Sequence, residues 1–437
     1  MNRWSGAQFW RATEFAYAIL ALFALTQGPV YRLWSQSALT IDRLPNPTIP
    51  HVHFASFVAV QIPALLLLVR RARLATVREK GNIALLVFLC WMTLTVVWST
   101  FSRQSFPEVV ALLLTTAVGL YLAVSFSERE FWIVIAGSMA VGVGTSWIAV
   151  MRLWDGAVNF QEDYWIGIYF NRNSLAPVAA VAMIAAIGII MTLHNTVSRS
   201  SRIPTLLLFA SSRALLVYSA IELWQSKSQT SPFALLVGTA TVALWLTLHG
   251  VSVRLAVPSR VRVQSAPLAM AVIGIALFLT MRAIGGFGGI SGETMTFNSR
   301  RALWTLSWDG IQERPWLGWG WMAAWRNSEF FVDGVWWATW DSVWSHNGYH
   351  DVLLGGGVVA GLLFVVYLWL CGIQLAQRKV FQVVPRLLLA AYVLAAATQE
   401  SFFIGSHFAW ALLVAALAPA FASHSSVDED DSTKVAT

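Results

Sequence analysis

Continuous apolar runs of about 20 residues, separated by short polar connections, restrict the fold of this sequence more than any other feature. A helix of about 20 apolar residues spans the ~30 Å hydrocarbon core of a bilayer. Because that core holds no water, the backbone must satisfy its own hydrogen bonds, and runs without the alternation of a barrel strand favour helices. The chain is 57% hydrophobic and 12% charged, whereas soluble domains carry about 25% charged residues. The sequence therefore predicts an all-α polytopic membrane protein.

Hydropathy in windows of about 19 residues predicts twelve transmembrane helices. An even number of spans places both termini on one side of the membrane. Most basic loop residues lie on that side, which the positive-inside rule makes cytoplasmic. The predicted spans are 12–31, 52–69, 82–99, 106–125, 131–151, 174–193, 204–224, 231–248, 266–282, 350–374, 385–400 and 402–422, and the basic connections are 70–80, 194–203, 249–264 and 375–386.

The predicted organisation has four parts. Residues 1–282 contain the first nine helices, 283–349 form one large extracytoplasmic loop, 350–422 contain the last three helices, and 423–437 form a disordered acidic cytoplasmic tail.

The formal charge of +7 is spread between the apolar runs, so it indicates membrane lipids and topology, with no nucleic-acid partner. The only two cysteines fall inside apolar runs, and we expect neither a metal nor another cofactor.

Tryptophan is concentrated in the large loop, where ten of the 23 Trp residues lie. Long loops in compact proteins are usually functional. Two interpretations stay open: a compact subdomain on the membrane surface, or flat aromatic surfaces that contact sugar rings and isoprenoid chains. The residues that we expect to contact a glycan or a lipid are Trp304, Trp319, Trp336, Trp340 and Tyr349.

Two adjacent arginines mark the start of a helix predicted within this loop over 299–312. Cations are disfavoured at a helix N-terminus, where free N–H groups also point outward, so Arg300 and Arg301 favour an anionic partner such as a phosphate. The alternative is a structural salt bridge to Glu293 or Asp309.

A histidine and two further basic residues are also expected on the outer side. His346 lies at the end of the loop, and Asp341 or Asp351 is near enough in sequence to orient its ring. A neutral imidazole there could take a proton from a hydroxyl group, although a lone histidine is more often structural. Arg172 precedes the sixth predicted span and Lys227 the eighth, so both should face the same compartment.

One strong charge is predicted inside the membrane. Arg213 lies in the middle of the seventh predicted span, where an ionised residue should face the bundle interior or water. Its expected partner is Glu222 or Glu400, and a structural ion pair is as consistent with the sequence as a functional one.

Short motifs in and around the loop resemble the O-antigen ligase and polymerase superfamily. In that family an Arg followed by Trp, a turn of Pro, apolar, Gly, aromatic and Gly, and a His-Asn pair bound a large periplasmic loop. The matching segments here are 299–304 (SRRALW), 313–320 (ERPWLGWG) and 346–349 (HNGY), followed by a Gly-rich span. Upstream, 170–176 (FNRNSLA) and 226–231 (SKSQTS) resemble two further family elements.

The resemblance implies a GT-C-like fold with short helices in the loop, and an activity. The implied reaction moves a glycan from undecaprenyl diphosphate to a hydroxyl of a glycolipid or glycan acceptor, at the outer face of the bacterial cytoplasmic (inner) membrane and without a metal ion. By resemblance, Arg300 contacts the diphosphate, and His346 activates the acceptor or positions the reacting groups. Lys227 or Arg172 would supply a second diphosphate contact, and Glu400 also has family counterparts. An O-antigen ligase of lipopolysaccharide or surface polysaccharide synthesis is favoured over a polymerase, although only the acceptor distinguishes them.

A transporter or flippase for lipid-linked saccharides is the alternative from another class. It predicts charges along many spans and an internal repeat, whereas the sequence has one strong intramembrane charge and no obvious repeat. The chain also lacks a Gly-rich nucleotide loop and the paired Asp motif of metal-dependent nucleotide-sugar transferases. A lipid-linked donor therefore fits the sequence better than a nucleotide-sugar donor.

Overall fold

The structure is a computed structural model that describes residues 6–28, 49–71, 78–196, 202–283, 295–326, 344–405 and 407–418. Within these ranges the protein is all-α apart from one two-stranded antiparallel sheet. The elements are α1 (Gly6–Leu25), α3 (Ile49–Arg71), α5 (Lys80–Trp98), α6 (Ser102–Ser125), α7 (Glu128–Met151), β1 (Val158–Asn159), β2 (Tyr164–Trp165), α8 (Arg172–Thr196), α9 (Arg202–Gln225), α10 (Thr230–Arg254), α11 (Ser259–Arg262), α12 (Ser265–Ala283), α13 (Met295–Glu313), η1 (Ala324–Arg326), α14 (Gly348–Leu375), α15 (Val380–Ala396) and α16 (Phe408–Leu417).

Seven of the described helices are long and apolar enough to cross a membrane, as a multi-pass membrane protein requires. They are α5, α6, α7, α8, α9, α10 and α14. Two further apolar helices, α15 and α16, are shorter. Each of the twelve predicted spans overlaps one helix, but a twelve-span arrangement in a bilayer stays a prediction.

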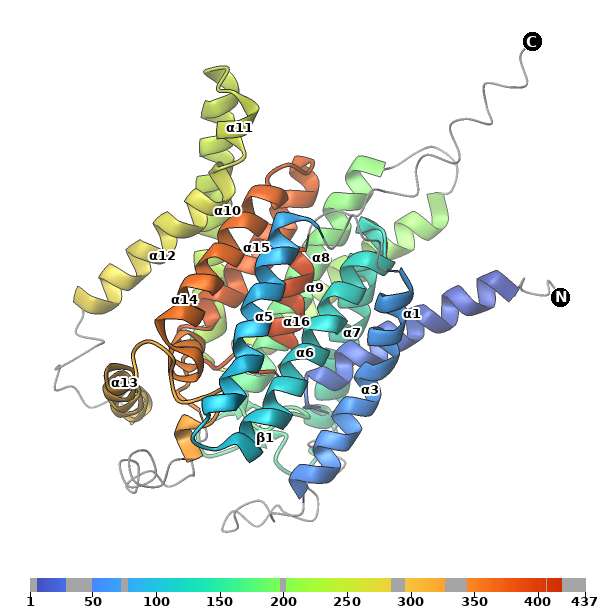
Figure 1. Ribbon diagram of the computed structural model, residues 1–437. Helices are drawn as coiled ribbons and strands as arrows, with labels where there is room; N and C mark the ends of the chain where they lie inside the picture. Colours follow the sequence, from blue (N-terminus) through green and yellow to red (C-terminus); the bar gives the residue numbers. More distant parts are fainter. Residues whose placement is uncertain are drawn as a thin grey trace.

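The long helices run side by side as one bundle (Figure 1). The short helix α11 lies at one end of the bundle, and α13 and the hairpin of β1 and β2 lie at the other end, called here the α13 end (Figure 1). Arg260 and Arg262 lie in α11, as the positive-inside rule predicts for the cytoplasmic end. The α13 end is the end that the sequence predicts to face outward.

Helix α16 is the centre of the bundle, and every one of its residues is buried. Its Trp410 donates a hydrogen bond to Thr116 of α6 at 2.8 Å and packs near Phe403, whose ring centroid is 6.1 Å away. Close packing around these ten apolar residues holds α16 against its neighbours. The segment that joins α15 to α16 is therefore fixed at the α13 end.

Helix α14 is kinked at Gly357, whose φ of 68° lies in the left-handed region. The segment after α13 packs into the kink and replaces hydrogen bonds of the helix: Trp319 N–H donates to Leu354 O at 2.7 Å, and Val358 N–H donates to Pro315 O at 2.7 Å. A Cβ atom on Gly357 would lie 2.1 Å from Trp316 O, so only glycine fits there. The predicted turn of Pro, Gly and Trp thus joins the loop to the helix.

Arg213 does not face the bundle interior, the first of its two predicted surroundings, and it does not pair with either expected carboxylate. Its side chain is exposed on α9, and its guanidinium lies 4.2 Å from the centre of the Phe209 ring. The physical reason is that α9 is peripheral, with only 22% of its most apolar window buried. Neither expected partner contacts it: Glu400 pairs with Arg300, and Glu222 is buried without a hydrogen-bond partner among the described residues.

Candidate functional site

Three side chains from three separate segments meet at the α13 end. Arg300 of α13 places Nη2 2.5 Å from Glu400 Oε1, and His346 places Nδ1 3.3 Å from Glu400 Oε2. Glu400, in the connection between α15 and α16, therefore holds both sequence-predicted residues, and we name the three the Glu400 triad. The side chains are 15%, 12% and 25% exposed for Arg300, Glu400 and His346. The triad is thus largely shielded from solvent but not closed.

The charges of the triad determine the ionisation of Glu400. Burial alone would raise the pKa of this carboxyl group, but the hydrogen bond with the His346 ring and the positive charge of Arg300 outweigh burial and lower the pKa. Glu400 is therefore a carboxylate at neutral pH. A guanidinium has five N–H donors, so the contact through Nη2 is compatible with further contacts from Arg300 to an anion.

The start of α14 fixes His346. Asn347 caps the helix, since its side-chain oxygen accepts hydrogen bonds from the N–H groups of Tyr349 and His350. Ser345 Oγ lies 2.7 Å from Asp351 Oδ1, and the Ser345 N–H donates to the same oxygen at 3.0 Å. Between these anchored neighbours His346 has a φ of 53°, an uncommon conformation that such anchoring can sustain.

Backbone contacts join the start of α14 to the segment that carries Glu400. The Gly348 N–H donates to Ala397 O at 2.8 Å and lies 3.1 Å from Glu400 O. A Cβ atom on Gly348 would lie 2.7 Å from the Phe403 ring, so a side chain there would separate the two segments. The geometry between His346 and Glu400 is therefore set by main-chain bonds as well as by side chains.

Arg172 and Lys227 lie apart from the triad, beside the hairpin of β1 and β2. Arg172 Nη1 is 3.8 Å from Glu162 Oε2, and Lys227 Nζ is 3.1 Å from Asp163 Oδ2. The Arg172 guanidinium also lies 4.8 Å from the centre of the Tyr164 ring. We call these contacts the hairpin ion pairs. No described contact joins either cation to Arg300 or His346.

Hydrogen bonds nevertheless connect the two groups through the segment 226–231. Ser228 Oγ donates to Asn173 Oδ1 at 3.1 Å, next to Arg172 in the chain. Two residues on, Thr230 Oγ1 donates to Gln399 Oε1 at 3.0 Å, next to Glu400. The serine- and threonine-rich motif thus bridges the hairpin ion pairs and the triad.

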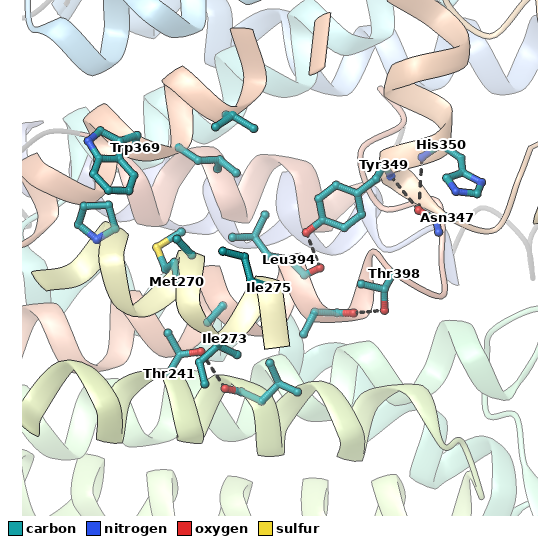
Figure 2. A pocket seen from close by; sticks show the side chains of 18 of the residues that line it. Thr241, Met270, Ile273, Ile275, Asn347, Tyr349, His350, Trp369, Leu394 and Thr398 are labelled. Atoms are coloured by element: carbon teal, nitrogen blue, oxygen red, sulfur yellow. Dashed lines mark hydrogen bonds between the residues drawn. The ribbon is translucent and has the colours of Figure 1, made fainter. Parts of the chain in front are cut away.

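A cavity of about 520 Å³ lies between α10, α12, α14 and α15. Its walls are mainly aliphatic and aromatic, with His350 and Asn347 at one end and Trp369 at the other (Figure 2). Tyr349 also lines the cavity, and its hydroxyl donates to Leu394 O at 2.9 Å. Trp304 of α13 lines the same cavity one helical turn beyond Arg300. The apolar cavity therefore ends close to the triad.

The other sequence-predicted site residues have different surroundings. Trp319 is 2% exposed, and its indole N–H donates to Gly310 O at 2.9 Å, so its contacts are with the protein. Arg301 lies in α13, but its side chain is outside the described part of the structure. Trp336 and Trp340 lie outside the described residues, as does the predicted acidic tail. The described residues contain no group of three His, Cys, Asp or Glu side chains that could hold a metal ion.

Sequence reasoning missed two features of the site. It noted Glu400 only through the family resemblance and as a partner for Arg213, although a carboxylate at the end of an apolar run is itself a signal of pairing. It did not single out His350, which is 5% exposed and lines the cavity. A second imidazole in the first turn of α14 was the available clue.

Comparison of the chain with protein-family models, curated proteins and solved structures found no match.

Proposed function

We propose that the protein is a glycosyltransferase that moves a glycan from undecaprenyl diphosphate to an acceptor hydroxyl at the outer face of a bacterial cytoplasmic membrane. The observation that carries the proposal is that Arg300 and His346 meet on one carboxylate beside an apolar cavity. A lipid-linked sugar diphosphate needs these features together: a cation for the diphosphate, a base for the acceptor and an apolar path for the lipid. The ligase type, which uses a glycolipid acceptor, is the form that we favour.

Each group has a defined task in this reaction. The acceptor oxygen attacks the anomeric carbon, the bond from that carbon to the diphosphate oxygen breaks, and the electron pair of that bond stays on the diphosphate. Arg300 stabilises the charge that develops on the leaving diphosphate. The acceptor proton passes to His346 Nε2, because Nδ1 faces Glu400. Glu400 orients the ring and stabilises the imidazolium that forms, as a buried carboxylate does beside a catalytic histidine.

The decisive experiment is reconstitution of the full chain in vesicles with a lipid-linked glycan and a candidate acceptor. We expect a covalent product without added nucleotide, which would exclude transport as the sole activity. Arg300→Ala and His346→Ala should each lower the rate by about 10²–10³-fold. The matched controls are Arg152→Ala, at an exposed arginine that ends α7, and His249→Ala, at a histidine of α10 whose ring lies 5.3 Å from that of Trp245.

The outcomes separate the candidate functions. Equal loss in the control variants would mean that the triad has no special role, and normal transfer by both triad variants would refute the assignment. Movement of the lipid-linked glycan across the vesicle membrane without a new covalent bond would support the flippase. Running the same assay with a lipopolysaccharide core and with a second lipid-linked repeat unit distinguishes a ligase from a polymerase, because only the acceptor differs.

A further inference from the structure

Two buried nitrogen atoms that have no hydrogen-bond partner among the described residues belong to side chains that line the apolar cavity. His350 is 5% exposed and Trp304 is 6% exposed, and both line the cavity. Neither His350 Nδ1 nor Trp304 Nε1 has a hydrogen-bond partner among the described residues. Burying an unpaired polar group is costly, so such groups normally meet a partner in the working protein. The cavity is the space from which that partner can come.

The chemistry of the two side chains indicates which partner they would take. An indole N–H can only donate a hydrogen bond, and a neutral imidazole protonated at Nδ1 donates there as well. Two donors on side chains that line the same cavity favour an oxygen acceptor, and an anionic oxygen gives the stronger bond. The rest of the wall is mainly apolar, so the oxygen must belong to a molecule whose other end is a hydrocarbon.

The cavity is open toward the region where lipid would surround the bundle. Ile275 of α12 is 58% exposed and Val365 of α14 is 59% exposed, and both line the cavity. Trp369, at the end far from His350, is 39% exposed (Figure 2). A hydrocarbon chain can therefore reach the cavity between α12 and α14 without passing through water.

The position of Arg300 relative to Trp304 indicates the order in which a ligand would contact the side chains along α13. Arg300 and Trp304 are four residues apart in α13, so they lie on the same face of the helix about one turn apart. His350 lies in the first turn of α14, and His346 directly precedes Asn347, the residue that caps this helix. A ligand that lies along both helices thus meets Trp304 and His350 first and the Glu400 triad next.

We propose that Trp304 and His350 bind the lipid-proximal phosphate of a polyisoprenyl diphosphate donor, while Arg300 binds the distal phosphate. The hydrocarbon chain then occupies the cavity toward Trp369, and the sugar lies beyond Arg300, beside His346. This inference rests on the proposed function for the class of the ligand. It adds two residues that set the depth of the donor, so that the anomeric carbon stops at the catalytic histidine.

The test measures equilibrium binding of two labelled lipids to the full chain in phosphatidylcholine nanodiscs. Undecaprenyl phosphate carries the lipid-proximal phosphate, and undecaprenol carries the same hydrocarbon without it. Trp304→Phe and His350→Phe should each weaken undecaprenyl phosphate binding about tenfold, which is typical of one lost hydrogen bond to an anion, and should change undecaprenol binding less than about twofold. Trp369→Phe makes the same substitution at the other end of the cavity and should leave the ratio of the two affinities unchanged.

Each outcome decides one question. The deciding quantity is the affinity for undecaprenyl phosphate divided by the affinity for undecaprenol. If this ratio is unchanged in Trp304→Phe and His350→Phe, the inference is overturned. An equal fall of the ratio in Trp369→Phe would overturn it as well. If the unaltered chain does not bind undecaprenyl phosphate saturably, the inference and the donor class fail together. If the ratio falls as expected but reconstituted vesicles form no covalent product, the phosphate site stands and the transferase proposal fails.

Discussion

The α13 end contains two groups of cations that are held in different ways. In the Glu400 triad two basic residues share one carboxylate that is only 12% exposed. In the hairpin ion pairs each cation has its own carboxylate, and Glu162 and Asp163 are 65% and 91% exposed. Water screens an exposed pair and leaves it worth little, whereas a buried charge depends strongly on its partner. The comparison indicates that the triad is the organised site and the hairpin pairs are its surroundings.

Apart from substitutions of Arg300 and His346 themselves, removal of the shared carboxylate should lower the transfer rate most. Glu400→Ala leaves Arg300 and His346 without their common partner, and we expect transfer to fall about 100-fold, in line with losing one partner of a buried pair. Glu400→Gln should fall less, because the amide keeps an oxygen acceptor. The measurement is the initial rate of glycan transfer in vesicles. Glu162→Ala, which removes one exposed hairpin carboxylate, is the control, and an equal loss there would erase the distinction between the two groups.

The lowered pKa of Glu400 predicts how stability depends on pH. A carboxyl group with a lower pKa in the folded protein stabilises the fold above its unfolded pKa, and that contribution is lost as the pH falls through the folded pKa. The difference in thermal midpoint between the native chain and Glu400→Gln should therefore be constant near neutral pH and shrink below the ordinary carboxyl pKa of 4.5. Thermal unfolding in detergent at a series of pH values checks this. A difference that does not change with pH would contradict the ion pair.

Loss of the Thr230–Gln399 hydrogen bond, which links the hairpin ion pairs to the Glu400 triad, should lower the transfer rate less. Thr230→Val removes the hydroxyl that bonds Gln399 and leaves that buried amide oxygen unpaired, so we expect about a fivefold loss of transfer. Thr239→Val is the matched control on the same helix, since its hydroxyl bonds the Leu235 carbonyl one turn away. An equal loss in both variants would show a general weakening of α10 and no coupling to the triad.

The hairpin cations should give the smallest effect. Arg172→Ala and Lys227→Ala each remove one ion pair whose carboxylate is exposed, so we expect the transfer rate to fall less than about threefold. The rates are measured at low and at high salt, because a remote steering charge loses its influence as salt is added. A loss as large as that of Arg300→Ala would contradict the proposed place of the diphosphate at the triad and would favour the hairpin instead.

Hydropathy located the helices well but not all of their ends. Predicted spans at 174–193 and 204–224 match α8 and α9 within a few residues, because an apolar run of that length has few alternatives in a membrane. The last two spans fit less well: α15 begins at Val380 and contains Pro385, and α16 covers only Phe408–Leu417. Hydropathy did not detect the irregular segment between them, because Phe402, Phe403 and Ile404 are apolar and nevertheless lie outside a helix.

The candidate site was partly predictable. Arg300 and His346 stood out because charged or titratable residues are scarce and lie at the ends of predicted elements. Their meeting on Glu400 was not predictable, since it depends on how α13, α14 and α16 pack together. The tryptophans of the loop also differ in burial, which the sequence does not show. Trp316 is 68% exposed, whereas Trp321 is fully buried.

The kink of α14 has a consequence for the order of assembly. The carbonyls of Leu354 and Gly355 accept bonds from Trp319 and Gly320, which precede them in the chain. A growing chain therefore carries the donors for the broken turn before the turn itself is made. An unpaired carbonyl in lipid would be costly, so α14 can bend at membrane depth only because its partner segment has already been synthesised. The direction of synthesis thus favours closure of the loop onto the helix as the helix inserts.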